Sequence, residues 1–178
     1  MKHSDFYIGL EFVGSAGFRW RCTDVGARTI LAIHLDRHDP LWYQGPPYIA
    51  KETVFDEYEI KRCHLTETDA ITASVREFKT SGHPGYPDEV VAHMLRASDH
   101  DQGSRYPHQG VLRFDRCRVD GEILHPYAAR QDDENWVVEL YLPFRNTYDE
   151  MTERDFIALP IASAKDVRVR ADLRIDKG

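Results

Sequence analysis

The sequence has few cysteines and no long apolar run. Its three cysteines, Cys22, Cys63 and Cys117, are odd in number, and none belongs to a Cys-x-x-Cys pair. This pattern argues against a disulfide framework or a zinc ribbon and favours reduced thiols. No apolar stretch approaches the roughly 18 residues that span a bilayer, and residues 1–5 lack the charged-then-apolar order of a leader. A cytoplasmic protein without membrane association is therefore expected.

Positive charge is also scarce. The 23 Lys and Arg residues are outnumbered by 30 Asp and Glu residues, which gives a formal net charge of −7 and a pI near 5.7. A surface of this sign disfavours duplex nucleic acid as the main partner. Because 42% of the residues are hydrophobic and 11% are aromatic, the 178 residues can build one packed domain or two small ones.

Catalytic motifs are missing as well. No serine lies in a Gly-x-Ser-x-Gly elbow, no His-Glu-x-x-His is present, and Gly14-Ser15-Ala16-Gly17 lacks the lysine of a phosphate loop. Cys117 lies between two arginines, but on a regular strand these would point away from the thiol. No catalytic residue is predicted.

What the sequence does contain is a hairpin pattern at residues 18–36. Apolar and charged residues alternate over 18–22, turn residues follow with Gly26 available for a positive φ, and 29–35 is apolar and β-branched. An earlier strand over 6–13 and closing strands near 54–55 and 60–65 extend this into a meander. Residues 1–65 are thus expected to form a small SH3-like barrel or a curled meander.

The rest of the chain alternates between helix and strand patterns. Thr66 and Asp69 form a capping pair for a helix over 67–79, and a second helix is expected over 87–97. Strands are expected over 111–119, 122–127, 136–142 and 167–175, with a hairpin at Asp120-Gly121 and a helical turn over 147–155. The order predicts an α+β fold that is mainly antiparallel. Residues 66–178 supply two helices and a C-terminal antiparallel sheet, which can share one core with residues 1–65.

Two motifs in the first 65 residues carry a resemblance. Residues 20–26 read Trp-Arg-Cys-Thr-Asp-Val-Gly, and Gly45-Pro46-Pro47-Tyr48 is followed by Val-Phe-Asp-Glu-Tyr at 54–58. Over residues 6–65 the chain resembles an uncharacterised family of short bacterial proteins associated with mobile or accessory genes. The resemblance implies a bacterial, cytoplasmic setting, and it brings no catalytic residue with it.

The first candidate site is the aromatic loop of residues 37–50. Trp42, Tyr43 and Tyr48 surround a rigid Pro-Pro segment. Large amphipathic rings are preferred as interface anchors, because they bury much area at a low cost in entropy. The alternative interpretation is that the loop folds back and caps the open end of the barrel.

The second candidate site is a histidine-rich stretch. Four of the nine histidines lie within residues 83–108, with aspartates between them. Imidazole and carboxylate together suit zinc or a similar divalent metal, and a water bound there would become a nucleophile. The candidate ligands are His93, Asp99, His100, Asp101 and His108. No pair has helical i, i+4 spacing, so a solvated loop with incidental histidines is the alternative.

The third candidate site is an arginine face. On a strand over 167–175, Arg168, Arg170 and Arg174 would line one side and could meet an acidic partner or phosphates. Aspartates at 166, 172 and 176 would neutralise much of this charge, so an ordinary solvated face is the alternative.

These patterns favour a non-enzymatic binding module that recognises another protein or a peptide and needs no cofactor. A metal-dependent hydrolase or nuclease at the histidine-rich stretch is the second hypothesis. The third is an immunity-type or antitoxin-type inhibitor of a partner protein, which the small size and acidic charge also fit.

Overall fold

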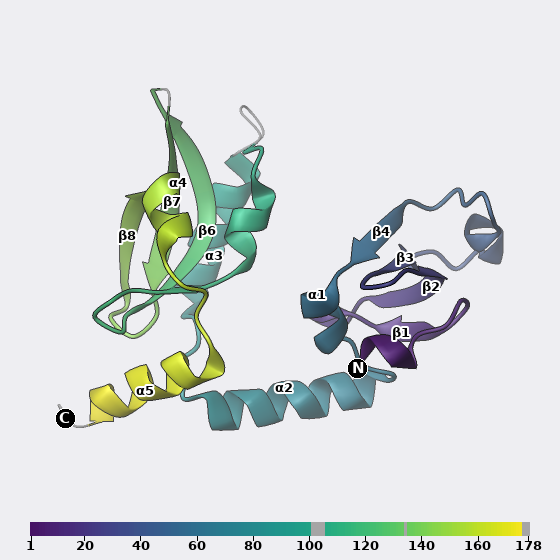
Figure 1. Ribbon diagram of the computed structural model, residues 1–178, viewed down its shortest axis with the longest axis horizontal. Coiled ribbons are helices and arrows are strands. Elements are labelled where there is room, and N and C mark those ends of the chain that lie inside the picture. The colour runs from purple at the N-terminus through teal and green to yellow at the C-terminus, as the bar shows by residue number, and fades with distance from the viewer. Residues whose placement is uncertain (101–105, 134, 176–178) are drawn as a thin grey trace. The chain divides into compact units, whose positions relative to one another are not determined.

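The computed structural model describes residues 1–100, 106–133 and 135–175 (Figure 1). The chain divides into two compact units, Met1–Glu77 and Phe78–Gly178. Each unit contains one four-stranded antiparallel sheet. The predicted α+β class with mainly antiparallel sheet is therefore confirmed.

The first unit is a meander. Its strands pair in chain order, so that β1 and β4 are the edges of an open sheet. The strands are β1 (Glu11–Val13), β2 (Arg19–Val25), β3 (Ile30–His34) and β4 (Glu52–Phe55). The predicted hairpin is β2–β3, although Gly26 is not among the residues with positive φ. The curled-meander form of the prediction fits this sheet, whereas no closed barrel forms among the described residues.

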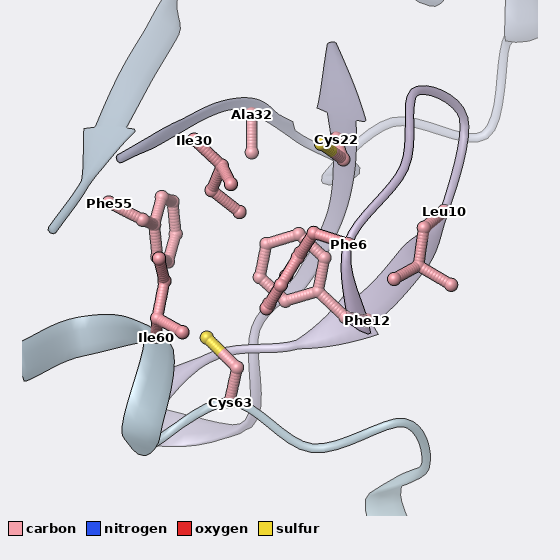
Figure 2. Packing of buried hydrophobic residues seen from close by; sticks show 9 residues of the cluster. All are labelled: Phe6, Leu10, Phe12, Cys22, Ile30, Ala32, Phe55, Ile60 and Cys63. Atoms are coloured by element: carbon pink, nitrogen blue, oxygen red, sulfur yellow. The ribbon is translucent and has the colours of Figure 1, made fainter. Parts of the chain in front are cut away.

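The core of the first unit lies on one face of this sheet (Figure 2). Phe12 stands at its centre, with edge-on contacts to the rings of Phe6 and Phe55 at centroid distances of 5.1 and 5.4 Å. The other members are Leu10, Cys22, Ile30, Ala32, Ile60 and Cys63. Burial raises the pKa of the Cys63 thiol to about 12, so this cysteine is a packing residue that stays protonated.

Residues 60–65 do not form the predicted closing strand. The first two residues of this segment end the helix α1 (Glu57–Lys61), and only His64 pairs with the sheet, through an isolated antiparallel bridge to Val13 of β1. Asp56 caps this helix by accepting hydrogen bonds from the backbone N–H groups of Tyr58 and Glu59, and the Glu59 side chain accepts one from the Asp56 N–H. This reciprocal cap stabilises a helical turn, and the helix brings Ile60 into the core.

The helix α2 (Glu67–Ser81) confirms the helix predicted over 67–79. Thr66 accepts a hydrogen bond from the Asp69 N–H at its start, and Gly82 follows its end with a φ of +70°. The boundary between the two units falls within α2.

The second unit has the sheet order β5-β6-β7-β8. Its strands are β5 (Arg116–Cys117), β6 (Ile123–Asp132), β7 (Asn135–Leu142) and β8 (Thr147–Thr152). Asp120-Gly121 lies in the predicted β5–β6 turn, where Gly121 has a φ of +81° and donates its N–H to the Arg118 carbonyl.

Two helices cover opposite faces of this sheet (Figure 1). On one face Phe156 of α4 (Glu153–Ala158) packs with Val138 and Leu140 of β7. On the other face His93 of α3 (Asp88–His100) contacts the rings of Tyr127 and Tyr148. The second predicted helix is thus confirmed as α3.

Three predictions for the second unit are wrong. Residues 109–113 form a 3₁₀ helix, which leaves only the two-residue β5 of the strand expected over 111–119. The helical turn expected over 147–155 is mostly the strand β8. The strand expected over 167–175 is the helix α5 (Ala164–Ile175), because Ser163 and Asp166 cap a helix at its start through hydrogen bonds in both directions.

Candidate functional site

The aromatic loop of residues 37–50 joins β3 to β4 and is fastened to itself by Tyr43. Asp39 caps a short 3₁₀ turn, Pro40–Tyr43, by accepting a hydrogen bond from the Leu41 N–H at 2.9 Å. The Tyr43 hydroxyl then accepts the N–H of Arg37 at 2.5 Å and donates to its carbonyl at 2.9 Å. These two bonds hold the Arg37 backbone in one position at the entry to the loop.

Arg37 and Trp42 form an exposed stacked pair in this loop. The guanidinium carbon of Arg37 lies 4.3 Å from the centre of the Trp42 ring, a cation–π contact. Trp42 is 39% exposed. The stacked pair is therefore ordered by its own contact and remains accessible to a partner.

Tyr48 has a structural role within the loop. Residues 45–48 form a turn, in which the Tyr48 ring packs so closely on Gly45 that a Cβ at position 45 would overlap it. Only glycine fits there without a shift of the ring. The structure thus separates the three predicted binding aromatics, since Tyr43 and Tyr48 shape the loop while Trp42 faces outward.

Two hollows flank Arg37 and Tyr43. The Trp42 hollow, of about 320 Å³, is lined by His34, Asp36, Arg37, Trp42, Tyr43, Ile49, Ala50, Lys51 and Thr53. The arginine hollow, of about 290 Å³, is lined by Glu11, Arg19, Arg21, Leu35, Asp36, Arg37, His38, Pro40 and Tyr43. Asp36, Arg37 and Tyr43 belong to both. Each hollow has the size of one or two side chains, so the loop offers two adjacent places for parts of one ligand.

The arginine hollow has a defined charge geometry. One carboxylate oxygen of Glu11 accepts a hydrogen bond from Arg19 at 2.9 Å, and the other accepts one from Arg21 at 2.8 Å. These contacts, the one with Arg21 being the stronger, lower the pKa of Glu11. The Arg21 guanidinium carbon also lies 5.8 Å from the centre of the Tyr43 ring. Strand pairing explains the arrangement, because Glu11 on β1 is the direct partner of Arg21 on β2.

The arginine face expected on a strand over 167–175 does not form among the described side chains, because this segment is the helix α5. The helix α5 places Arg168 and Arg170 in different directions, since neighbours two apart diverge on a helix. Arg168 is exposed. Arg170 binds the Glu122 carboxylate at 2.9 Å, and Arg145 binds the same oxygen at 2.6 Å. The side chain of Arg174 lies outside the described residues. The arginines alternate with valines, a pattern that is typical of a strand. This pattern predicted a strand in place of the helix α5, and so it predicted the wrong grouping of the arginines.

The predicted metal ligands are not brought together where the structure describes them. His93 packs on Tyr127 and Tyr148, while His108 contacts the Glu153 carboxylate at 2.6 Å. The side chains of Asp99 and His100, and Asp101 as a whole, lie outside the described residues. Within the described part of the chain, no three histidine, cysteine or acidic side chains are placed to hold a metal ion.

A different histidine cluster was missed from the sequence. The Nδ1 atom of His125 lies 2.8 Å from an Asp115 carboxylate oxygen, and the Tyr86 ring packs between the rings of His125 and His83 at centroid distances of 4.8 and 5.1 Å. An ionised carboxylate only accepts, so Nδ1 of His125 carries the hydrogen in this contact. The β5–β6 register, in which Arg116 pairs with Leu124 and Cys117 with Ile123, brings Asp115 opposite His125. The two-residue turn expected at Asp120-Gly121 would have placed Pro126 there instead, so the sequence signal was off by one residue.

Comparisons with protein-family models, with curated proteins and with solved structures found no match. Among the described residues, no helix is long and apolar enough to cross a membrane.

Proposed function

We propose that the first unit is a binding module that holds a segment of a partner protein against the aromatic loop. The observation that carries this proposal is the Arg37–Trp42–Tyr43 arrangement. Tyr43 fixes the backbone of Arg37, Arg37 stacks on an exposed Trp42, and Arg37 and Tyr43 line both hollows. Pre-ordered tryptophan and arginine side chains are the residue types that contribute most to binding free energy at interfaces.

The other two hypotheses have less support. A metal-dependent hydrolase needs converging ligands, and the described candidates His93 and His108 have separate partners. An immunity-type or antitoxin-type inhibitor is itself a partner-binding protein, and the same loop would serve it. A bacterial cytoplasmic setting, which the resemblance over residues 6–65 implies, is part of the proposal.

The test is to select binders from a phage-displayed library of random peptides on the full-length chain, then measure the affinity of the selected peptides. Trp42→Ala is expected to weaken binding about tenfold or more, as the loss of an interface anchor does. Its thermal midpoint should stay close to that of the wild type, because Trp42 is 39% exposed.

The matched control is Tyr7→Ala, which removes another exposed aromatic ring of the same unit, 62% exposed and outside both hollows. This variant should bind like the wild type. The proposal fails if no peptide is selected above background, or if both variants bind equally well. A loss of several degrees in the Trp42→Ala midpoint would show that the ring is packing for the loop, which also contradicts the proposal.

A further inference from the structure

We propose that the ligand of this loop is an acidic peptide segment, and that one of its carboxylates enters the arginine hollow. The inference rests on the proposed function, and it adds the chemical class of the partner and the side chains that recognise it. Arg19, Arg21 and Arg37 are the recognising groups.

The local charge is opposite to that of the chain. The two hollows together contain four cationic side chains, Arg19, Arg21, Arg37 and Lys51, and two carboxylates, Glu11 and Asp36. With histidines neutral this leaves a charge of +2, on a chain whose net charge is −7. Such a concentration of the minority charge around a concave surface attracts an anionic group and orients its approach.

Glu11 shows what kind of group the hollow accepts. Its carboxylate takes one hydrogen bond from Arg19 and two from Arg21. A guanidinium has five N–H donors in a planar fork, so both arginines keep donors for a second carboxylate. Because Arg19 is 58% and Arg21 34% exposed at the side chain, these donors are accessible. Glu11 therefore orders the two arginines and competes with a ligand for their charge.

The peptide is favoured over a nucleic acid for two reasons. A chain of net charge −7 repels a long polyanion, while a single carboxylate responds to the local field. In addition, one face of the Trp42 ring is covered by Arg37, which limits its use as a platform for stacked bases. A short acidic segment needs only the hollow and the exposed part of the Trp42 ring.

The experiment uses the peptides selected on the full-length chain, each made as selected and with every Glu and Asp replaced by Gln and Asn. The acidic forms should bind at least about fivefold more tightly, and this difference should shrink at high salt. Arg19→Gln should weaken binding of the acidic form about fivefold. Arg28→Gln, which also breaks an exposed arginine–glutamate pair in the same unit, should change nothing.

Glu11→Gln is the decisive variant. Removal of the competing carboxylate should tighten binding of the acidic peptides about threefold or more, a gain that a misfolded variant cannot imitate. Equal or weaker binding by Glu11→Gln would overturn the inference. Selection of neutral peptides would also overturn the inference, although it would support the binding module. If an oligonucleotide displaced the selected peptides at a lower concentration than the unlabelled peptides do, the ligand would be a nucleic acid and the inference would be wrong. Failure to select any peptide would instead refute the proposed function.

Discussion

His83 is a half-buried histidine whose Nε2 atom has no hydrogen-bond partner among the described residues. Its Nδ1 accepts the N–H of Gly85 at 3.0 Å, so the hydrogen of the neutral ring is on Nε2. Nε2 is buried and has no hydrogen-bond partner among the described residues. Burial lowers the pKa of His83, Asp115 opposes this shift and His125 adds to it. The folded protein therefore favours the neutral form of this side chain.

This predicts a loss of stability in mild acid. The unfolded chain binds a proton at His83 near the ordinary histidine pKa of about 6.5, and the folded chain binds it only at lower pH. The free energy of unfolding should thus fall as the pH drops from about 7 to about 5. His83→Asn keeps an acceptor for the Gly85 N–H and removes the titrating group. Urea unfolding at both pH values should show a smaller loss for this variant, and equal losses would contradict the assignment.

At the level of single residues, the sequence identified the right loop but not the role of each side chain. Trp42, Tyr43 and Tyr48 were recognised as rings around a Pro-Pro segment. Tyr43 bonds to the Arg37 backbone, and Tyr48 covers Gly45. Both contacts depend on the path by which the loop returns to β4. Arg19 and Arg21 were overlooked, because charged residues on alternate strand positions are typical of a solvated face. The arginine hollow beside them is formed partly by the aromatic loop, so it depends on where that loop folds.

At the level of elements, a capping pattern in the sequence marks the start of four helices. Four helices begin with Ser, Thr or Asp followed three residues later by Asp or Glu, at 56–59, 66–69, 152–155 and 163–166. In α5 the alternation of valines with arginines outweighed the cap, because β-branched residues at every second position are typical of strands. The local cap was the better predictor.

A buried carboxylate links α5 to the hairpin. Glu122 is 1% exposed, and one of its oxygens binds Arg145 and Arg170. Glu122→Gln would remove the carboxylate charge that Arg170 contacts and would leave Arg145 with Asp120 alone, at 3.3 Å. The expected cost is about 2 kcal/mol or more in unfolding free energy, less than for a fully buried pair because Arg145 is half exposed. Hydrogen exchange of the β6 amides as a function of urea measures this cost for the second unit.

The control for this prediction is Asp149→Asn. It removes a carboxylate that lies 3.6 Å from Arg118 at the surface of the same unit. Exposed pairs contribute about 1 kcal/mol or less, so the β6 amides should exchange almost as in the wild type. Similar effects of the two variants would show that the burial of Glu122 adds nothing to the attachment of α5.

At the level of the whole molecule, the described residues form two core clusters, each from a separate part of the sequence. The first contains residues from Phe6 to Cys63 and the second residues from Leu124 to Phe156. The composition allowed either one domain or two small ones, since length and hydrophobic content are compatible with both. Which apolar residues share a core is decided by long-range strand pairing, and this is the information that local patterns lack.

Separate cores predict that the first unit folds alone. A fragment of residues 1–81 keeps all four strands, α1 and α2, and the whole cluster around Phe12. Its amide NMR resonances for β1 to β4 should match those of the full chain, and it should bind the selected peptides with the same affinity. A fragment of residues 1–51 lacks β4 and the core residues Phe55, Ile60 and Cys63, so it should be unfolded. An unfolded 1–81 fragment would mean that the first core is too small to be stable without the rest of the chain, and binding studies would then require the full length.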